Sequence, residues 1–254
     1  MIPKTIHYCW LSGDPIPANL QECMRSWQDV MPDCEIICWD QSRFDVSSVE
    51  FVKQACEVKK WAFASDYIRA YALYKEGGIY LDVDVLLKKD LSGFLQSDFF
   101  SAIEFHENLY KKHKTSTLLS AGGASKIKYT AKPGVGMQAA VMGSVAGHPF
   151  LADVLRWYSC RDFFESGENY YGGILAPTVF AMIAEDYGFR YLDVMQSVNS
   201  GMLLLPSKLI SGNLMQATDE AFAVHCCAGG WRDKSAPSLL RRLFTRSSSW
   251  FSLL

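Results

Sequence analysis

The sequence predicts an α/β protein in which helices flank a mostly parallel sheet. Two observations predict this class: segments of strand character alternate with segments of helical spacing, and 49% of the residues are apolar. A chain of 254 residues is long enough to bury a substantial core, and its net charge of −2 excludes extended disorder. The near balance of 25 basic and 27 acidic residues argues against nucleic-acid binding.

The N-terminal third alternates strands and helices in a regular order. The predicted elements are a strand over 2–10, a helix over 20–30, a strand over 34–39, a short helix, a longer helix over 61–76 and a strand over 79–87. Leu20, Met24 and Trp27 share one face of the first helix. Gly77 and Gly78 end the long helix, because glycine accepts the left-handed conformation that follows a helix.

The second half is less regular. Residues 149–164 and 174–187 have helical spacing, whereas 202–205 and 221–227 have strand character. No linker or change of composition divides the chain before its end. We therefore expect one domain over residues 1–232, followed by a tail over 233–254.

The cysteines and the N-terminus indicate a cytoplasmic location. The N-terminal residues lack a basic region followed by an apolar run, and no stretch reaches the ~20 apolar residues of a membrane span. The eight cysteines show no second close pair with zinc-finger spacing. We expect free thiols in a reducing cytoplasm.

The tail is basic and aromatic. From Arg232 onward five basic residues stand against one acidic residue, so residues 232–254 carry +4 and the rest of the chain −6. A helix of this composition can lie on the anionic inner face of a cell membrane and bring the protein to a lipid-linked substrate. The alternative is a helix packed on the domain or a frayed terminus.

Two aspartates, Asp82 and Asp84, interrupt an apolar, β-branched run directly after the double glycine. Alternation along a strand places their carboxylates on one side and Leu81, Val83 and Val85 on the other. Two like charges on one face are costly unless a cation lies beside them, and a divalent metal with oxygen ligands supplies it. Such a metal suits departure of a diphosphate. The alternative is that both aspartates end the strand at the surface.

A second charged pair precedes this motif. Asp66 and Arg69 lie three residues apart on one face of the predicted helix over 61–76, a spacing that permits an ion pair. Because that helix is otherwise apolar, we expect the pair to face a polar cleft.

Together these segments resemble the family 32 glycosyltransferases, which share a sugar-binding Asp-x-Asp region and include capsular-polysaccharide, mannosyl- and galactosyltransferases. The resemblance rests on three ordered motifs within residues 2–10, 64–69 and 77–84, and extends more distantly to the glucosylating clostridial toxins. Residues 223–231 also resemble the family's closing His-to-Trp motif. Between about 90 and 220 the match is weak, and acceptor recognition is expected there.

The resemblance implies a retaining glycosyltransferase of the GT-A fold, with its ligand at the carboxyl ends of the strands. It implies nucleotide-sugar contacts from Trp10, Asp66, Arg69, Tyr80 and Asp82. It implies a divalent metal, Mn²⁺ or Mg²⁺, held by Asp84, His225 and Asp82. It implies catalytic roles for Asp82, Asp84, Arg69 and Trp231, the last of which closes over the donor.

The same resemblance implies the substrates. The donor is expected to be a UDP-sugar in preference to a GDP-sugar, and the acceptor an oligosaccharide or lipid-linked glycan, as in the biosynthesis of capsular polysaccharide or O-antigen. No residue stands out as a covalent nucleophile, so we expect attack on the same face of the sugar that the diphosphate leaves.

Two other functions are compatible with parts of the sequence. The segment around Asp82 also fits a phosphohydrolase of the haloacid dehalogenase type, although that class opens with this strand and 78 residues precede it here. A non-catalytic sugar-nucleotide-binding protein would carry the same motifs. Donor hydrolysis in the presence of manganese separates such a sensor from a transferase.

Overall fold

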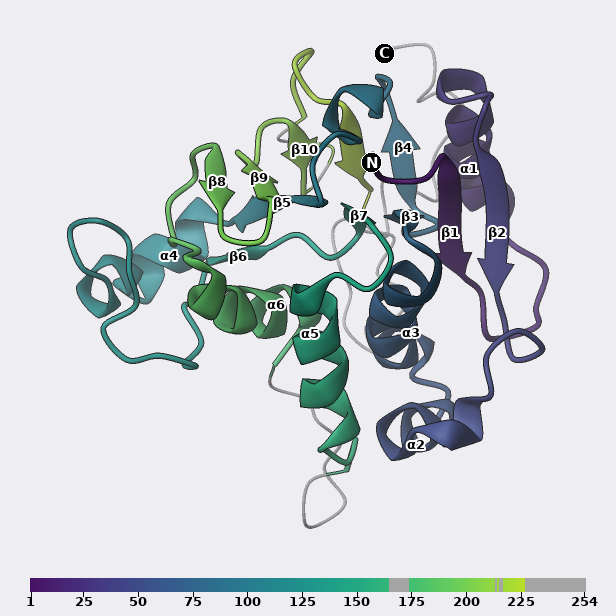
Figure 1. The fold of residues 1–254 in the computed structure, drawn as a ribbon, viewed down its shortest axis with the longest axis horizontal. Helices are drawn as coiled ribbons and strands as arrows, with labels where there is room; N and C mark the ends of the chain where they lie inside the picture. The colour runs from purple at the N-terminus through teal and green to yellow at the C-terminus, as the bar shows by residue number, and fades with distance from the viewer. Residues whose placement is uncertain (165–173, 213, 215–216, 227–254) are drawn as a thin grey trace.

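The predicted motif over 2–10 and the first half of the motif over 77–84 lie on two neighbouring strands of a large mixed sheet, and the motif over 64–69 lies on a helix (Figure 1). The computed structural model describes residues 1–164, 174–212, 214 and 217–226; Cys227, Trp231 and the tail over 233–254 lie outside the described residues. The helices are α1 (Ala18–Val30), α2 (Glu50–Glu57), α3 (Trp61–Glu76), α4 (Glu107–Lys112), α5 (Pro149–Ser159) and α6 (Ala176–Ala184). Within this described part, no helix combines the length and the hydropathy that a membrane span requires.

Two sheets contain all the described strands. The larger sheet comprises β1 (Thr5–Cys9), β2 (Glu35–Trp39), β3 (Gly78–Leu81), β5 (Phe99–Phe105), β6 (Val135–Met137), β7 (Val141–Ser144), β8 (Gln196–Val198) and β9 (Met202–Leu205). The smaller sheet comprises β4 (Val85–Leu87), β10 (Ile210–Ser211) and β11 (Ala223–His225).

The larger sheet has the order β2-β1-β3-β7-β5-β9-β8, with β6 beside β5. β1 pairs in parallel with both β2 and β3, β5 pairs in parallel with β9, and β7 is antiparallel to both of its neighbours. Consequently β2, β1, β3, β5 and β9 all point in one direction. The predicted α/β class with a mostly parallel sheet is confirmed.

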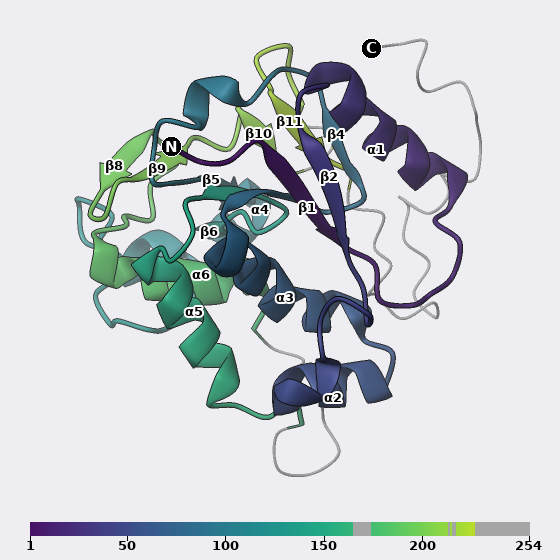
Figure 2. The ribbon, with the colours of Figure 1, turned by 45° about the vertical axis from the view of Figure 1, so that its right-hand side comes forward.

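Helices cover both faces of this sheet (Figures 1 and 2). One core cluster joins α2, α3, α5 and α6 to the sheet and contains Tyr80, whereas Ile79 and Leu81 belong to a second cluster with Trp27 of α1. The side chains of β3 therefore alternate between the two layers, as a buried strand requires. The indole N–H of Trp27 donates to the Val85 carbonyl at 2.7 Å, which fixes α1 beside β4.

The prediction of one strand over 79–87 is wrong. β3 ends at Leu81, and β4 begins at Val85 in the other sheet. Between them the chain turns: the Asp82 N–H donates to the Ala140 carbonyl, and the Val85 N–H donates back to the Asp82 carbonyl, both at 2.9 Å. Asp82 and Asp84 are thus residues of a turn between two sheets, and Val83 lines the same cleft as they do instead of facing away.

The predicted helix over 149–164 is too long, because α5 ends at Ser159. The periodicity continues through Phe163, which is buried among aromatic side chains outside any helix. The other predicted elements are present with small shifts at their ends, and the helix over 61–76 has the predicted bounds.

Gly78 allows β3 to approach β1. Its φ is +105°, and a Cβ there would lie 2.7 Å from the Thr5 carbonyl oxygen and 3.0 Å from Nε2 of His7.

The buried side chain of His7 links β2 to Gly77, the residue before β3. The Trp39 indole N–H donates to Nδ1 at 3.0 Å, so Nε2 carries the proton and donates to the Gly77 carbonyl at 2.8 Å. Burial lowers the pKa of His7.

This arrangement predicts a loss of stability in acid. Unfolded His7 binds a proton near pH 6.5 and folded His7 only at lower pH, so its contribution is complete above about pH 6.5 and falls below it. Burial also lowers the pKa of His148, so this residue contributes to the loss of stability in acid in the same direction. In thermal melts between pH 5 and 8, His7→Gln should show a shallower loss of melting temperature below pH 6.5 than the wild type. Parallel curves would contradict the assignment.

Candidate active site

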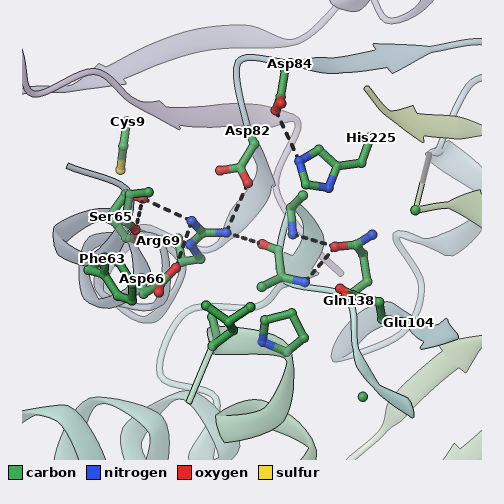
Figure 3. Close-up of a pocket in the computed structure, with 18 of the residues that line it drawn as sticks. Cys9, Phe63, Ser65, Asp66, Arg69, Asp82, Asp84, Glu104, Gln138 and His225 are labelled. Atoms are coloured by element: carbon green, nitrogen blue, oxygen red, sulfur yellow. Dashed lines mark hydrogen bonds and ion pairs between the residues drawn. The ribbon is translucent and has the colours of Figure 1, made fainter. Parts of the chain in front are cut away.

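A cleft of about 1420 Å³ opens where β1, β3 and β5 end. The neighbours of β1 are β2 on one side and β3 on the other, so the cleft lies at the switch in strand order where open α/β sheets bind ligands. Every predicted site residue in the described part of the chain lines it: Trp10, Asp66, Arg69, Tyr80, Asp82, Asp84 and His225. Figure 3 labels five of them, Asp66, Arg69, Asp82, Asp84 and His225. Trp231 lies outside the described residues.

Arg69 of α3 joins the helix motif to the turn motif (Figure 3). Its Nη2 lies 3.0 Å from Oδ1 of Asp66, and its Nη1 lies 3.3 Å from Oδ2 of Asp82. The guanidinium also donates to the Ala139 carbonyl at 2.8 Å and to the carbonyl and hydroxyl of Ser65 at 3.1 and 3.0 Å. One rigid donor fork therefore fixes both carboxylates.

The ion pair of Asp66 and Arg69 is buried. Their side chains are 13% and 6% exposed. Burial raises the pKa of Asp66 to about 7, an effect that Arg69 opposes and Asp82 reinforces. Burial alone would lower the pKa of Arg69, but the charges of Asp82 and its other anionic neighbours raise it well above its usual value. The guanidinium is therefore a permanent positive charge at the base of the cleft.

Tyr80 positions Asp82. Its hydroxyl donates to Oδ1 of Asp82 at 2.8 Å, and the Arg69 guanidinium lies 5.0 Å from the centre of its ring. Burial raises the pKa of Tyr80 well above its usual value, so the hydroxyl stays protonated as a donor. Because Tyr80 is only 1% exposed, most of its ring packs in the core.

Asp82, Asp84 and His225 form a group of three metal-ligand side chains whose ligand atoms all lie within 4.8 Å of one another. Strand pairing brings His225 there: β11 runs antiparallel to β4 with His225 opposite Val85, and the Cys226 N–H donates to the Asp84 carbonyl at 2.9 Å. Nε2 of His225 lies 3.3 Å from Oδ1 of Asp84. Two carboxylates and one imidazole fit Mn²⁺ or Mg²⁺ in their chemistry and spacing.

Trp10 follows β1 at the mouth of the cleft. Its indole N–H donates to the Asp14 carbonyl at 2.6 Å, which fixes the orientation of the ring, and the side chain is only partly buried. The ring is therefore held in place beside open space.

The polar residues of the cleft that the sequence motifs did not mark include Ser65, Gln138 and Glu104. Ser65 lies inside the helix motif and accepts a hydrogen bond from Arg69 through its hydroxyl. Its position next to Asp66 in the sequence is the feature that could have identified it. Gln138 follows β6; its Oε1 accepts from the N–H groups of Ala139 and Ala140, and its Nε2 is buried without a hydrogen-bond partner in the described structure. Glu104 of β5 lies in the region of weak resemblance, where no motif marks it.

Glu104 belongs to a polar pair on the β5 side of the cleft. Its Oε1 lies 2.9 Å from Nε2 of His106, and both residues line the cleft. The hydrogen bond to Glu104 raises the pKa of His106 despite partial burial.

Comparison with known proteins agrees with this geometry. Residues 17–108 match the family described as the glycosyltransferase sugar-binding region containing the DXD motif. The chain is 27% identical over 159 residues to inositol phosphoceramide mannosyltransferase 3 of Schizosaccharomyces pombe, covering 61% of this chain and 36% of that protein. It is 28% identical over 164 residues to mannosyl phosphorylinositol ceramide synthase SUR1 of Saccharomyces cerevisiae, covering 61% of this chain and 34% of that protein. The chain thus spans about a third of the length of these relatives.

A solved structure supports the fold. Mouse xyloside xylosyltransferase 1 superimposes over 92% of this chain and 98% of that one, with a TM-score of 0.51 and 10% identity. The fold is the GT-A glycosyltransferase fold, and residues 17–108 carry the DXD sugar-binding region. The resemblance predicted from the motifs is confirmed for this sequence region and for the fold. The matched family is a glycosyltransferase family and not a phosphohydrolase family.

Removal of Arg69 should be strongly destabilising. Arg69→Met leaves Asp66 and Asp82 without their counter-charge in a buried site, which costs about 3–5 kcal/mol. Urea unfolding at pH 8, where Asp66 of the wild type is ionised, measures the loss. The control is Arg43→Met, because Arg43 makes a more exposed ion pair with Glu76 at 2.9 Å and should cost less than about 1 kcal/mol. Equal losses in the two variants would contradict the role assigned to Arg69.

Proposed function

We propose that this chain is a metal-dependent, retaining glycosyltransferase that moves a hexose from a nucleotide diphosphate sugar, preferably a UDP-sugar, to a surface-glycan acceptor. The observation that carries the proposal is the convergence of Asp82, Asp84 and His225 on one wall of a cleft that Trp10 and Arg69 also line. The sugar-binding region over residues 17–108 supports the same reaction class.

The residues divide into three roles. Trp10 stacks on the nucleobase at the mouth of the cleft. Asp66 and Arg69 bind donor hydroxyls or the diphosphate, and Tyr80 holds Asp82 in position beside the ribose and the sugar. Trp231, which lies outside the described residues, closes over the bound donor.

The reaction breaks the bond between the anomeric carbon and the diphosphate and forms a bond to the acceptor oxygen on the same face. The acceptor hydroxyl gives its proton to the departing diphosphate. A divalent ion held by Asp82, Asp84 and His225 would neutralise the charge that grows on the diphosphate. Arg69 adds a fixed positive charge to the same cleft.

The acceptor is proposed to be an oligosaccharide or lipid-linked glycan, such as a capsular polysaccharide or O-antigen precursor. The names of the two yeast relatives, which refer to mannosyl transfer and to inositol phosphoceramide, support a lipid-linked acceptor. We propose that residues 1–232 form the catalytic domain, and that the basic tail over 233–254 holds it at the cytoplasmic face of the membrane.

The donor and the metal can be tested together. Hydrolysis of UDP- and GDP-sugars should be detectable with Mn²⁺ and lost in EDTA, and it should be fastest with one UDP-sugar. Asp84→Asn should lower the rate by about 100-fold or more, because it removes an anionic ligand. It should also weaken Mn²⁺ binding, as measured by calorimetry.

Asp90→Asn is the matched control, because Asp90 is exposed and caps a surface turn through the Ser92 N–H. Hydrolysis by Asp84→Asn at the wild-type rate would overturn the metal assignment. Metal-dependent binding of the donor without hydrolysis or transfer to any acceptor would instead identify a non-catalytic sensor.

Stacking by Trp10 has its own test. Trp10→Ala should weaken UDP binding by about tenfold, because stacking of a base on an aromatic ring is worth about 1–3 kcal/mol. Trp10→Phe should retain most of the affinity. Isothermal titration with UDP and Mn²⁺ measures both variants, and wild-type affinity in Trp10→Ala would place the base elsewhere in the cleft.

A further inference from the structure

The segment over residues 107–132, here called the α4 lobe, is strongly basic. It contains Glu107 as its one acidic residue and six lysines: Lys111, Lys112, Lys114, Lys126, Lys128 and Lys132. The lobe therefore carries +5 in a chain whose net charge is −2. This charge lies apart from the basic tail over 233–254.

Nearby carboxylates balance half of these lysines. Lys111 lies 2.5 Å from Glu107, Lys128 lies 2.8 Å from Asp186, and buried Lys132 lies 4.0 Å from Glu185. The remaining three, Lys112, Lys114 and Lys126, are exposed and form no ion pair within the described structure.

Hydrogen bonds through Thr117 hold Lys114 and Lys126 close to each other. The Thr117 N–H donates to the Lys114 carbonyl at 2.9 Å, and the Lys126 ammonium donates to the Thr117 carbonyl at 2.9 Å. Lys112 lies two residues before Lys114, at the end of α4. Lys112, Lys114 and Lys126 therefore form a local excess of positive charge.

The lobe also exposes apolar side chains. Of the ten large hydrophobic residues that are exposed in the described part of the chain, seven lie in the lobe or in the adjoining segment 192–195: Leu109, Leu118, Ile127, Tyr129, Leu192, Val194 and Met195. Ile127 is 68% exposed, and it lies next to Lys126. The adjoining segment packs on the lobe, because the Tyr191 N–H donates to the Gly123 carbonyl at 2.9 Å.

Both ends of the lobe reach the cleft. His106 and Leu109 line it where the lobe begins, and Ala131 and Pro133 line it where the chain returns to β6. Between these ends the lobe extends away from the sheet, at the left of Figure 1. A surface bound by the lobe would therefore lie beside the opening of the cleft.

We propose that the α4 lobe is a membrane-docking surface that binds a bilayer containing anionic lipids. Exposed lysines attract the anionic headgroups, and apolar side chains such as Ile127 and Leu118 enter the boundary between headgroups and acyl chains. A partner that offers only negative charge, such as an acidic glycan, would match the lysines but would leave the exposed apolar side chains in water. The combination of charge and apolar surface therefore favours a bilayer.

Co-sedimentation of the full chain with vesicles tests the proposal. Wild-type protein should bind vesicles of phosphatidylcholine with 30% phosphatidylglycerol and bind poorly to phosphatidylcholine alone. Because each lysine near an anionic surface strengthens binding by about fivefold, the variant Lys112→Glu/Lys114→Glu/Lys126→Glu should bind at least about 100-fold more weakly. Ile127→Ser should weaken binding without any change of charge.

Two matched variants separate the lobe from other sources of charge. Lys4→Glu/Lys75→Glu/Lys208→Glu changes the net charge equally at exposed lysines elsewhere, and it should retain most of the binding. Arg241→Glu/Arg242→Glu/Arg246→Glu tests the tail. Circular dichroism and thermal melts verify that each variant is folded.

The proposal is overturned if the wild type does not bind the anionic vesicles or if the lobe variant binds them as tightly as the wild type. It is also overturned if both lysine variants lose binding equally, or if only the tail variant loses it. These outcomes do not depend on sugar transfer, so the docking surface and the proposed reaction can fail separately.

Discussion

The buried guanidinium of Arg69 is the contact on which the site depends. It lies between Asp66 of α3 and Asp82 of the turn after β3, and it also binds the carbonyl of Ala139. Two carboxylates this close together are unfavourable in an apolar core unless a positive charge lies between them. Arg69 therefore allows the long helix and the central strand to end beside each other, and it fixes the position of one predicted metal ligand.

The same arrangement explains why the protein places its acidic motif in a turn. β3 belongs to the large sheet and β4 to the small one, so the chain has to leave one sheet and enter the other between Leu81 and Val85. The residues of this turn lie outside the regular alternation of either strand, so the side chains of Asp82 and Asp84 can both line the cleft. His225 reaches the same place from far along the sequence because β11 pairs with β4.

The sequence predicted the local elements better than it predicted long-range pairing. The helix over 61–76 was predicted with its bounds, since Gly77 ends the apolar periodicity, and the site residues of the N-terminal third were marked by their motifs. The turn at Asp82 was missed because its residues continue the alternation of the strand. β5 is buried on both faces for most of its length, so it shows no alternation, and Gln138 and Glu104 carry no local signal. The register that places His225 beside Asp84 depends on strands 140 residues apart.

The turn between β3 and β4 also links ligand binding to the integrity of the fold. Asp82 directly follows β3 of the large sheet, whereas His225 belongs to β11 of the small sheet. An ion bound between them would therefore tie the two sheets together without a covalent bond. Anything that binds only the folded chain raises its stability in proportion to the logarithm of its concentration. The availability of the ion would then set how firmly the small sheet is anchored to the large one.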